Sequence, residues 1–287
     1  MSKQKRELDL FRRYPWLKIV LFGIGVTAVA VVFAFMGRIA NREENVSDKA
    51  PGAGGVEMVV EESPDDKVSN DDDEEYEVTR EVEQIGAGQI IALTFDDGPS
   101  EYTESLLDFL RKKQVPATFF VLGKNANTYP DLVKREALEG HEVESHTMNH
   151  QNLAKLSEAD VRTEIANAEK TICGILEKAN CIKYLRPPYG EISNVVKNVV
   201  GKPMIGWSID TEDWKSKDPQ KIQDRTLQLI KGGSIILLHD IYGTSVEGAK
   251  RIINELLAAG FTFVTVDEMV QKMGVKLEAG SFYGRFD

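Results

Sequence analysis

The fold is decided by residues 89–98, which read Gln89-Ile90-Ile91-Ala92-Leu93-Thr94-Phe95-Asp96-Asp97-Gly98. Residues 89–95 are almost entirely apolar, which predicts a buried strand. Residues 104–113 follow with an apolar helical face, which predicts an amphipathic helix. This face consists of Leu106, Leu107, Phe109 and Leu110.

The alternation of strand and helix continues to residue 272. Ser157, three residues before Asp160, is expected to cap the longest of the helices. Alternating strands and helices predict an α/β fold with a parallel sheet, either closed into a barrel or open and doubly wound. Further strands are expected at 117–122, 141–144, 182–185, 204–209, 234–238 and 261–264, and helices at 130–139, 157–179, 219–231, 246–259 and 266–272.

Charge is distributed unevenly along the 287 residues, which carry 35 Lys and Arg, 46 Asp and Glu, and a formal charge of −11 at pH 7. Residues 1–42 carry +6, residues 43–83 carry −13, and the remainder carries −4. This acidity argues against a nucleic-acid binder, which usually shows a basic patch or stripe. We therefore expect no nucleic-acid partner.

The N-terminal block contains residues 19–37, nineteen consecutive uncharged and mostly apolar residues. At about 1.5 Å rise per residue, this run nearly matches a bilayer core of about 30 Å. Basic residues cluster in 1–18, so the positive-inside rule predicts a single-pass membrane anchor with its N-terminus in the cytoplasm. The alternative is a secreted protein whose signal peptide is cleaved after the Ala28-Val29-Ala30 pattern.

The next block, residues 38–85, is rich in acidic residues and poor in large apolar ones. Such a segment cannot bury enough surface to offset chain entropy, which predicts a disordered acidic linker. We interpret it as a spacer that holds a domain outside the membrane, with an acidic calcium-binding segment as the alternative. The folded domain is expected at 86–275 and a C-terminal tail at 276–287.

Polar clusters follow five of the predicted strands. In parallel α/β folds, functional residues gather in the loops at the C-terminal ends of strands, so these clusters are expected to meet on one face. They are Asp96-Asp97-Gly98, residues 146–150 (His-Thr-Met-Asn-His), residues 186–190 (Arg-Pro-Pro-Tyr-Gly), residues 210–214 (Asp-Thr-Glu-Asp-Trp) and His239-Asp240.

Three of the four histidines of the chain fall in these clusters. His146 and His150 can point the same way if the segment forms a helical turn, and with one carboxylate they make a two-His, one-carboxylate metal site. Asp96 and Asp97 are adjacent, so one can face the metal and the other a bound water. Such a metal activates water near neutral pH, and His239 can protonate a leaving atom. The pattern predicts metal-assisted hydrolysis.

Five segments together resemble the ordered motifs of the polysaccharide deacetylases, carbohydrate esterase family 4. The resemblance covers residues 90–273 and is closest to membrane-anchored peptidoglycan N-acetylglucosamine deacetylases. It implies an irregular (β/α) barrel with fewer strands than the eight-fold type. The motifs are Thr94-Phe95-Asp96-Asp97-Gly98, His146-Thr-x-x-His150, Arg186-Pro-Pro-Tyr189-Gly190, Asp210-x-x-Asp213-Trp214 and Leu237-Leu238-His239.

The resemblance assigns Asp97, His146 and His150 as metal ligands. It makes Asp96 the general base that takes a proton from the attacking water. Two histidines and a carboxylate suit zinc, which we expect, with cobalt, manganese or nickel as alternatives.

The resemblance also assigns the residues that handle the developing charges. The backbone N–H of Tyr189 is expected to hold the oxyanion. His239 would protonate the departing amine, and Asp210 would orient and charge-pair with His239. Arg186 would hold Asp96 as an ionised carboxylate.

The substrate-binding residues implied by the resemblance are Pro188, Tyr189, Trp214 and Leu237, of which Leu237 and Trp214 would line the pocket for the acetyl methyl and the sugar ring. The implied reaction is hydrolysis of N-acetyl groups of N-acetylglucosamine in peptidoglycan or a related chitooligosaccharide. The muramic-acid-directed members resemble Phe-Asp-Asn-Gly where this chain has Asp97, which favours N-acetylglucosamine. The alternatives are an esterase that removes O-acetyl groups from xylan and a catalytically silent glycan-binding module. We expect a monomer that contacts the glycan and, through its anchor, the membrane.

Each motif residue also has a structural interpretation when taken alone. Asp96-Asp97-Gly98 can be a simple turn, Arg186 a surface ion pair, and His239 a structural histidine. Cys173 and Cys181 lie outside the motifs. An even pair in an exported domain can form a disulfide, and the alternative is two reduced, buried cysteines.

Overall fold

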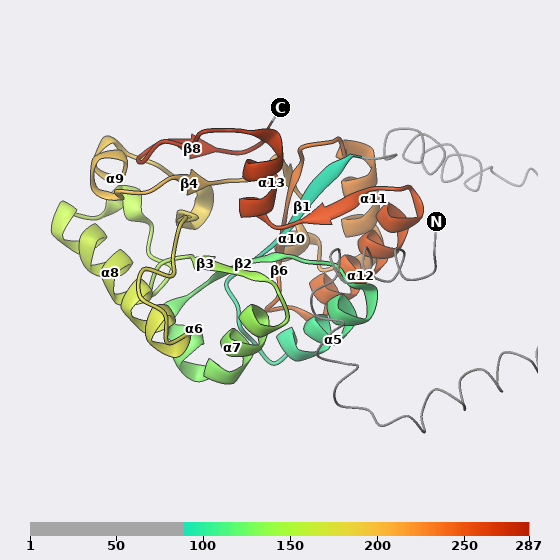
Figure 1. The fold of residues 1–287 in the computed structure, drawn as a ribbon, viewed down its shortest axis with the longest axis horizontal. Coiled ribbons are helices and arrows are strands. Elements are labelled where there is room, and N and C mark those ends of the chain that lie inside the picture. The colour runs from blue at the N-terminus through green and yellow to red at the C-terminus, as the bar shows by residue number, and fades with distance from the viewer. Residues whose placement is uncertain (1–88, 287) are drawn as a thin grey trace, which may run out of the picture. The chain divides into compact units, whose positions relative to one another are not determined.

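Strand β1 (Ile90–Asp96) runs through the middle of a six-stranded sheet (Figure 1). The structure is a computed structural model that describes residues 89–286. The strand order is β3-β2-β1-β6-β5, β7 also pairs with β1, and every pair is parallel. The predicted α/β class with a parallel sheet is therefore confirmed. The other strands are β2 (Thr118–Val121), β3 (Glu142–Ser145), β5 (Ile209–Asp210), β6 (Ile235–His239) and β7 (Thr262–Val264).

The sheet is continued toward a barrel by short links. Single-residue bridges join Ser145 to Leu185 and Leu185 to Met204. Met204 begins β4 (Met204–Ile205), which also pairs with β8 (Phe282–Tyr283). Because β5 follows β4 after three residues and pairs with β6, this chain of links returns to the central strands. The arrangement agrees with an irregular (β/α) barrel.

Two predicted strands differ from the observed elements. The strand expected at 182–185 is reduced to the bridge at Leu185. The strand expected at 204–209 is split into β4 and β5. At the break, the Gly206 N–H donates to the carbonyl of Tyr283, and a Cβ at this position would collide with the ring of Phe282. The chain therefore pairs with β8 up to Gly206 and joins β6 of the main sheet from Ser208 onward.

Helices cover the outside of the sheet (Figure 1). Elements α6, α9, α10 and β8 were not expected from the sequence, because elements this short leave no readable periodicity. The helices are α5 (Thr103–Lys113), α6 (Gly123–Thr128), α7 (Pro130–Leu138), α8 (Glu158–Ile175), α9 (Asn194–Val199), α10 (Asp213–Ser216), α11 (Pro219–Leu229), α12 (Gly243–Ala258) and α13 (Val266–Met273), with 3₁₀ turns at Leu153–Lys155 and Pro188–Gly190.

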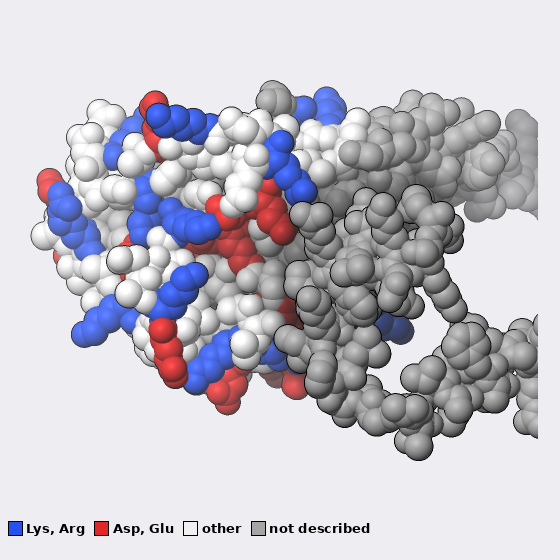
Figure 2. Space-filling model, viewed as in Figure 1, with Lys and Arg blue, Asp and Glu red and all other residues white. Residues whose placement is uncertain are grey.

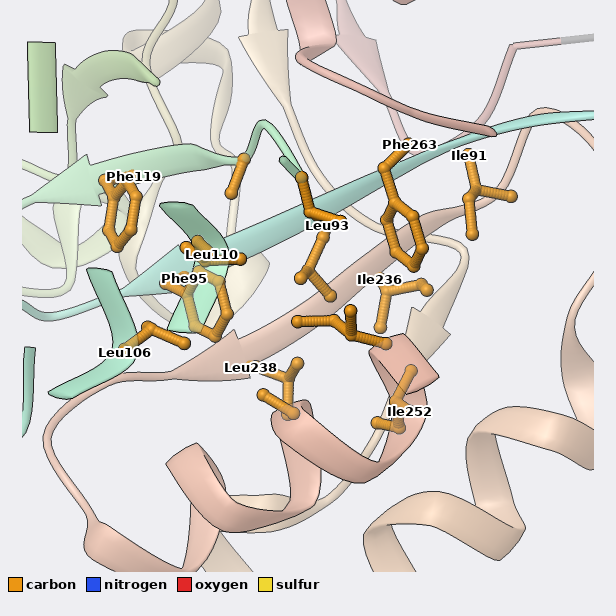
Figure 3. Packing of buried hydrophobic residues seen from close by; sticks show 14 of the residues in the cluster. Ile91, Leu93, Phe95, Leu106, Leu110, Phe119, Ile236, Leu238, Ile252 and Phe263 are labelled. Carbon is orange, nitrogen blue, oxygen red and sulfur yellow. The ribbon is translucent and has the colours of Figure 1, made fainter. Parts of the chain in front are cut away.

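The two faces of β1 have different surroundings, because successive strand residues point to opposite sides. Ile91, Leu93 and Phe95 pack in the main hydrophobic core beneath α5 and α12, and Figure 3 shows this packing. Ala92 belongs to a separate core cluster, and the Thr94 hydroxyl donates to a carbonyl of β6. The even-numbered residues of β1 therefore face the opposite side of the sheet from the main core, and Asp96 is the last of them.

The segment predicted as a C-terminal tail packs against the domain through β8 and the buried side chain of Phe286. The predicted cytoplasmic segment 1–18, anchor 19–37 and linker 38–85 lie outside the described residues. Within residues 89–286, no helix has the length and apolarity needed to cross a membrane.

The longest helix, α8, begins as expected, since Ser157 Oγ accepts from the Asp160 N–H. It ends at Ile175, earlier than the predicted residue 179. Cys173 and Cys181 form a disulfide across this end, with their Cα atoms 5.5 Å apart. The turn that brings the two cysteines together replaces the last predicted helical residues.

Removal of this disulfide by Cys173→Ser and Cys181→Ser is expected to lower the free energy of unfolding by about 2 kcal/mol, because the unfolded chain gains freedom. Urea unfolding of both proteins measures the difference. Equal stability, or two free thiols in non-reducing mass spectrometry of the unaltered protein, would show that the bridge does not form.

Candidate active site

A cavity of about 400 Å³ opens where β1, β5 and β6 end. Most residues predicted for the site line this cavity, so the structure brings them together. These are Asp96, Asp97, His146, His150, Tyr189, Asp210, Trp214, Leu237 and His239, with Trp207 and Tyr242 in addition.

Three potential metal ligands converge in the cavity. Asp97 Oδ1 lies 3.4 Å from His150 Nε2 and 3.6 Å from His146 Nε2. One ligand atom from each residue lies within 4.8 Å of the others, and Asp97 Oδ1 is buried without a hydrogen-bond partner. An unpaired carboxylate oxygen facing two imidazole nitrogens fits a divalent metal.

The protonation state of His146 suits this role. Its Nδ1 donates to the Arg186 carbonyl at 2.7 Å. Because a carbonyl can only accept, Nδ1 carries the hydrogen and Nε2 keeps its lone pair. Burial lowers the pKa of His146 to about 3, with Asp97 opposing the shift. The ring is therefore neutral at physiological pH, as a metal ligand must be.

The segment that carries the two histidines is a loop and not the helical turn expected from their spacing. Thr147 and His150 have positive φ angles of 73° and 61°, and the His150 N–H donates to Thr147 Oγ1. Asp97 and Tyr189 also have positive φ, 72° and 63°. Such conformations cost about 1–3 kcal/mol each and persist where the surroundings impose them. Backbone strain is thus concentrated beside the cavity.

Asp96 is buried and held by Arg186. The Arg186 guanidinium is 0% exposed and donates from Nη1 to Asp96 Oδ1 at 2.7 Å. Further hydrogen bonds run to Thr94 Oγ1 and to the carbonyls of Ile205 and Gly206. The ion pair is therefore interior and not a surface pair.

Burial raises the pKa of Asp96, and the Arg186 charge opposes the rise. The pKa nevertheless remains above its ordinary value, so the expectation that Arg186 simply depresses it is incomplete. A raised pKa makes the carboxylate a better proton acceptor near neutral pH, provided that the cation keeps it ionised.

His239 pairs with Asp213, so the predicted pairing with Asp210 is wrong. His239 Nδ1 lies 2.8 Å from Asp213 Oδ1, and the His239 N–H donates to Asp213 Oδ2. Asp213 begins α10 and is fully buried, which places its carboxylate under the imidazole. Asp210 instead accepts from the Glu212 N–H at 2.9 Å and lines the cavity. Both Asp210 and Asp213 belong to the Asp-x-x-Asp motif, so the sequence alone could not show which of them pairs with His239.

This contact sets the charge of His239. Burial lowers the pKa of His239. The hydrogen bond to Asp213 and the charges of Asp213, Asp96 and Asp97 outweigh this effect and raise the pKa to about 9. Burial raises the pKa of Asp213, but the hydrogen bond and charge of His239 bring it below its ordinary value. The pair is therefore an imidazolium and a carboxylate at neutral pH.

The mouth of the cavity is aromatic. Tyr189 and Trp214 are 61% and 49% exposed, and the Tyr189 ring lies edge-on to His150 at 4.7 Å. Leu237 is buried at the wall, and Pro188 starts the 3₁₀ turn that carries Tyr189. No sequence pattern pointed to Trp207 and Tyr242, because both lining residues lie outside the five motifs.

A second cavity, of about 370 Å³, lies between β3 and α13 at the opposite end of β3. Figure 2 shows acidic side chains gathered on this face. Glu144 accepts from the N–H groups of Lys183 and Tyr184, and Lys183 Nζ pairs with Asp267 at 2.6 Å. Within residues 89–286, no set of three metal-ligating residues other than Asp97, His146 and His150 converges, and this set lines the first cavity.

Comparisons with known proteins agree with this geometry. A family model described as polysaccharide deacetylase matches residues 84–203. A peptidoglycan-N-acetylglucosamine deacetylase of Bacillus cereus is 41% identical over 189 residues, which cover 63% of this chain and 68% of that protein. The chain belongs to the polysaccharide deacetylase family.

Other members of the polysaccharide deacetylase family share the fold. A solved structure described as T48 deacetylase with substrate is 41% identical in sequence to this chain and superposes with a TM-score of 0.65. The match covers 68% of this chain and 96% of that one. A family 4 acetyl xylan esterase from Clostridium thermocellum, solved with a cobalt ion, has 29% identity and a TM-score of 0.64, covering 69% and 98%. Peptidoglycan-N-acetylglucosamine deacetylase PgdA of Listeria monocytogenes is 39% identical over 71% of this chain. The match spans only 43% of the length of that enzyme.

The His239–Asp213 pair makes a prediction about pH for this family member. If protonated His239 donates a proton in the reaction, kcat/KM falls as pH rises through about 9, where His239 loses its proton. Asp213→Asn removes the charge that raises this pKa, so the alkaline limb moves to lower pH. Asp210→Asn is the matched control, and its limb stays in place. A limb that moves with Asp210→Asn but not with Asp213→Asn would contradict the observed pairing.

Proposed function

We propose that this chain hydrolyses the N-acetyl groups of N-acetylglucosamine residues in peptidoglycan or a related chitooligosaccharide. The observation that carries the proposal is the convergence of the Asp97, His146 and His150 triad with Asp96 and His239 in one cavity. The same arrangement speaks against a catalytically silent binding module, which needs neither a buried base nor a protonated acid.

The residues fit a divalent metal, with Asp97, His146 and His150 as its ligands. A bound metal of this kind would polarise the amide carbonyl and lower the pKa of a water molecule. Zinc suits two imidazoles and one carboxylate, as do cobalt, manganese and nickel.

Asp96 is placed to act as the general base. Its Oδ2 lies 3.7 Å from His146 Nε2, so it faces the same space as the metal ligands. Its other oxygen is held by Arg186 at 2.7 Å. A carboxylate fixed by one oxygen presents the other, which can accept a proton from the attacking water.

His239 is placed to act as the general acid. The register of β1 and β6 puts Asp96 beside His239, so base and acid lie on neighbouring strands. With Nδ1 engaged by Asp213, the proton on Nε2 is the one available to the departing amine. The amine must leave protonated because an amide anion is a poor leaving group.

The remaining residues shape the space for an acetylated sugar. The Tyr189 backbone N–H is assigned to the carbonyl oxygen as its negative charge develops. Leu237 provides buried apolar surface in the cavity for the acetyl methyl, and the exposed ring of Trp214 can pack against the sugar. Similarity to two peptidoglycan-N-acetylglucosamine deacetylases supports this sugar as substrate.

We also propose that residues 19–37 anchor the protein in the cell membrane, with 38–85 as a spacer that lets the domain reach the wall outside. A monomer satisfies this arrangement, because all the proposed catalytic groups come from one chain.

Acetate release by the full chain from peptidoglycan, chitooligosaccharides and acetylxylan tests the function. We expect release from peptidoglycan or chitooligosaccharide, and its loss after metal chelation with recovery on adding zinc. Asp96→Asn is expected to lower kcat by about 10²–10⁴-fold, because the general base is lost.

Two outcomes would reject parts of this proposal. Activity on acetylxylan alone would identify an O-acetyl esterase, in line with the similarity to an acetyl xylan esterase. Undiminished activity of Asp96→Asn would refute the proposed base while leaving the substrate assignment intact.

A further inference from the structure

Lys217 occupies an unusual backbone position next to the cavity. It follows α10, the short helix that carries Trp214, and has a positive φ of 47°. Glycine or asparagine is the usual residue at such a helix end, because a side chain makes this conformation unfavourable. A lysine in this conformation is strained, and a strained backbone position is often associated with function.

The Lys217 side chain lies beside the cavity, over one of its lining residues. Its ammonium lies 4.8 Å from the centre of the Tyr242 ring, and Tyr242 lines the cavity together with Trp214. The cation is therefore close to an aromatic side chain that a substrate in the cavity would also contact.

No carboxylate within residues 89–286 pairs with this ammonium. Lys215, two residues earlier, pairs instead with Glu212 at 3.5 Å, and Arg225 pairs with the same carboxylate at 3.2 Å. Beside the cavity, Lys217 is thus a positive charge whose electrostatic partner is not supplied by the described part of the chain.

The carboxylates at the cavity have cationic partners, because Arg186 pairs with Asp96 and the protonated His239 pairs with Asp213. A divalent metal on the proposed ligands would balance the remaining carboxylates. Lys217 is then an additional positive charge beside the cavity. An anionic group on the substrate would pair with Lys217, whereas a neutral glycan such as a chitooligosaccharide would offer it no partner.

We propose that Lys217 binds a carboxylate on the sugar next to the N-acetylglucosamine that is deacetylated. This inference rests on the proposed function and narrows its substrate class to a glycan with an acidic neighbouring sugar. Peptidoglycan fits this description, because its alternate sugar carries a lactyl group that ends in a carboxylate where no peptide is attached. The Tyr242 ring offers an apolar face for that neighbouring sugar.

Matched substrates test the inference. We would compare tetrasaccharides of alternating N-acetylglucosamine and N-acetylmuramic acid that differ only in the lactyl group, a free carboxylate in one and its methylamide in the other. A third substrate carries the stem peptide, which places carboxylates further from the sugar. Acetate release by the full chain gives kcat/KM for each, and calorimetry with Asp96→Asn measures binding without turnover.

The unaltered chain is expected to prefer the free carboxylate over the methylamide by about fivefold, as for a single solvent-exposed ion pair. The preference should shrink as salt screens the charge. Lys217→Met should bring the ratio to about one, and Lys217→Arg should retain it. Lys215→Met, the matched control, should keep the full preference.

Lys217→Gly separates binding from misfolding. Glycine accepts the positive φ without strain, so this variant should have a raised Tm and yet lose the preference for the carboxylate. A preference for the peptide-bearing substrate over the free carboxylate would place the anion on the peptide and contradict the proposal.

Two further outcomes would overturn the inference. One is equal kcat/KM on the carboxylate and methylamide substrates by an active wild-type chain, and the other is an unchanged preference in Lys217→Met. If no substrate releases acetate, the proposed function fails. In that case the calorimetric preference still decides whether Lys217 reads the carboxylate.

Discussion

The buried guanidinium of Arg186 contacts residues from several strands that form the site and holds them together. Its side chain donates hydrogen bonds to Asp96 at the end of β1 and to the backbone carbonyls of Ile205 and Gly206 at the end of β4. It also lies 3.9 Å from the centre of the Phe120 ring on β2. Through its own carbonyl it fixes the tautomer of His146. A buried charge without such partners would cost several kcal/mol, so the surrounding strands must provide hydrogen-bond acceptors for this residue.

The strand geometry explains why this pair meets the remaining groups. Alternation along β1 directs Phe95 into the core and Asp96 into the interior, and the parallel register with β6 sets Asp96 beside His239. The loops after the strands contribute Asp97 and Tyr189 to the cavity. Both residues adopt left-handed backbone conformations that a regular strand does not allow. Regular structure thus places the proposed base and acid, and strained loops place the proposed metal ligands and the N–H of Tyr189.

Much of this arrangement was predictable from the sequence. The apolar run that forms β1 and the polar residues after each strand were enough to expect a parallel sheet with its site at one end. The partner of His239 was not predictable, because Asp210 and Asp213 have the same chemistry and only the start of α10 separates them. Trp207 lies in the break between β4 and β5, and Lys217 ends a four-residue helix. Elements of two to four residues have no periodicity to read, so positions that depend on them need the structure.

Arg186 opposes the rise that burial imposes on the pKa of Asp96, and the acid limb of the pH dependence of kcat/KM measures this effect. Arg186→Lys preserves a positive charge but cannot reproduce the set of hydrogen bonds to Asp96, Thr94 and the carbonyls. Since Arg186 lowers the pKa of Asp96 and burial raises it, we expect the acid limb of the variant to move to higher pH. An acid limb at the same pH in both proteins, with the variant folded and active, would show that Arg186 does not set the ionisation of Asp96.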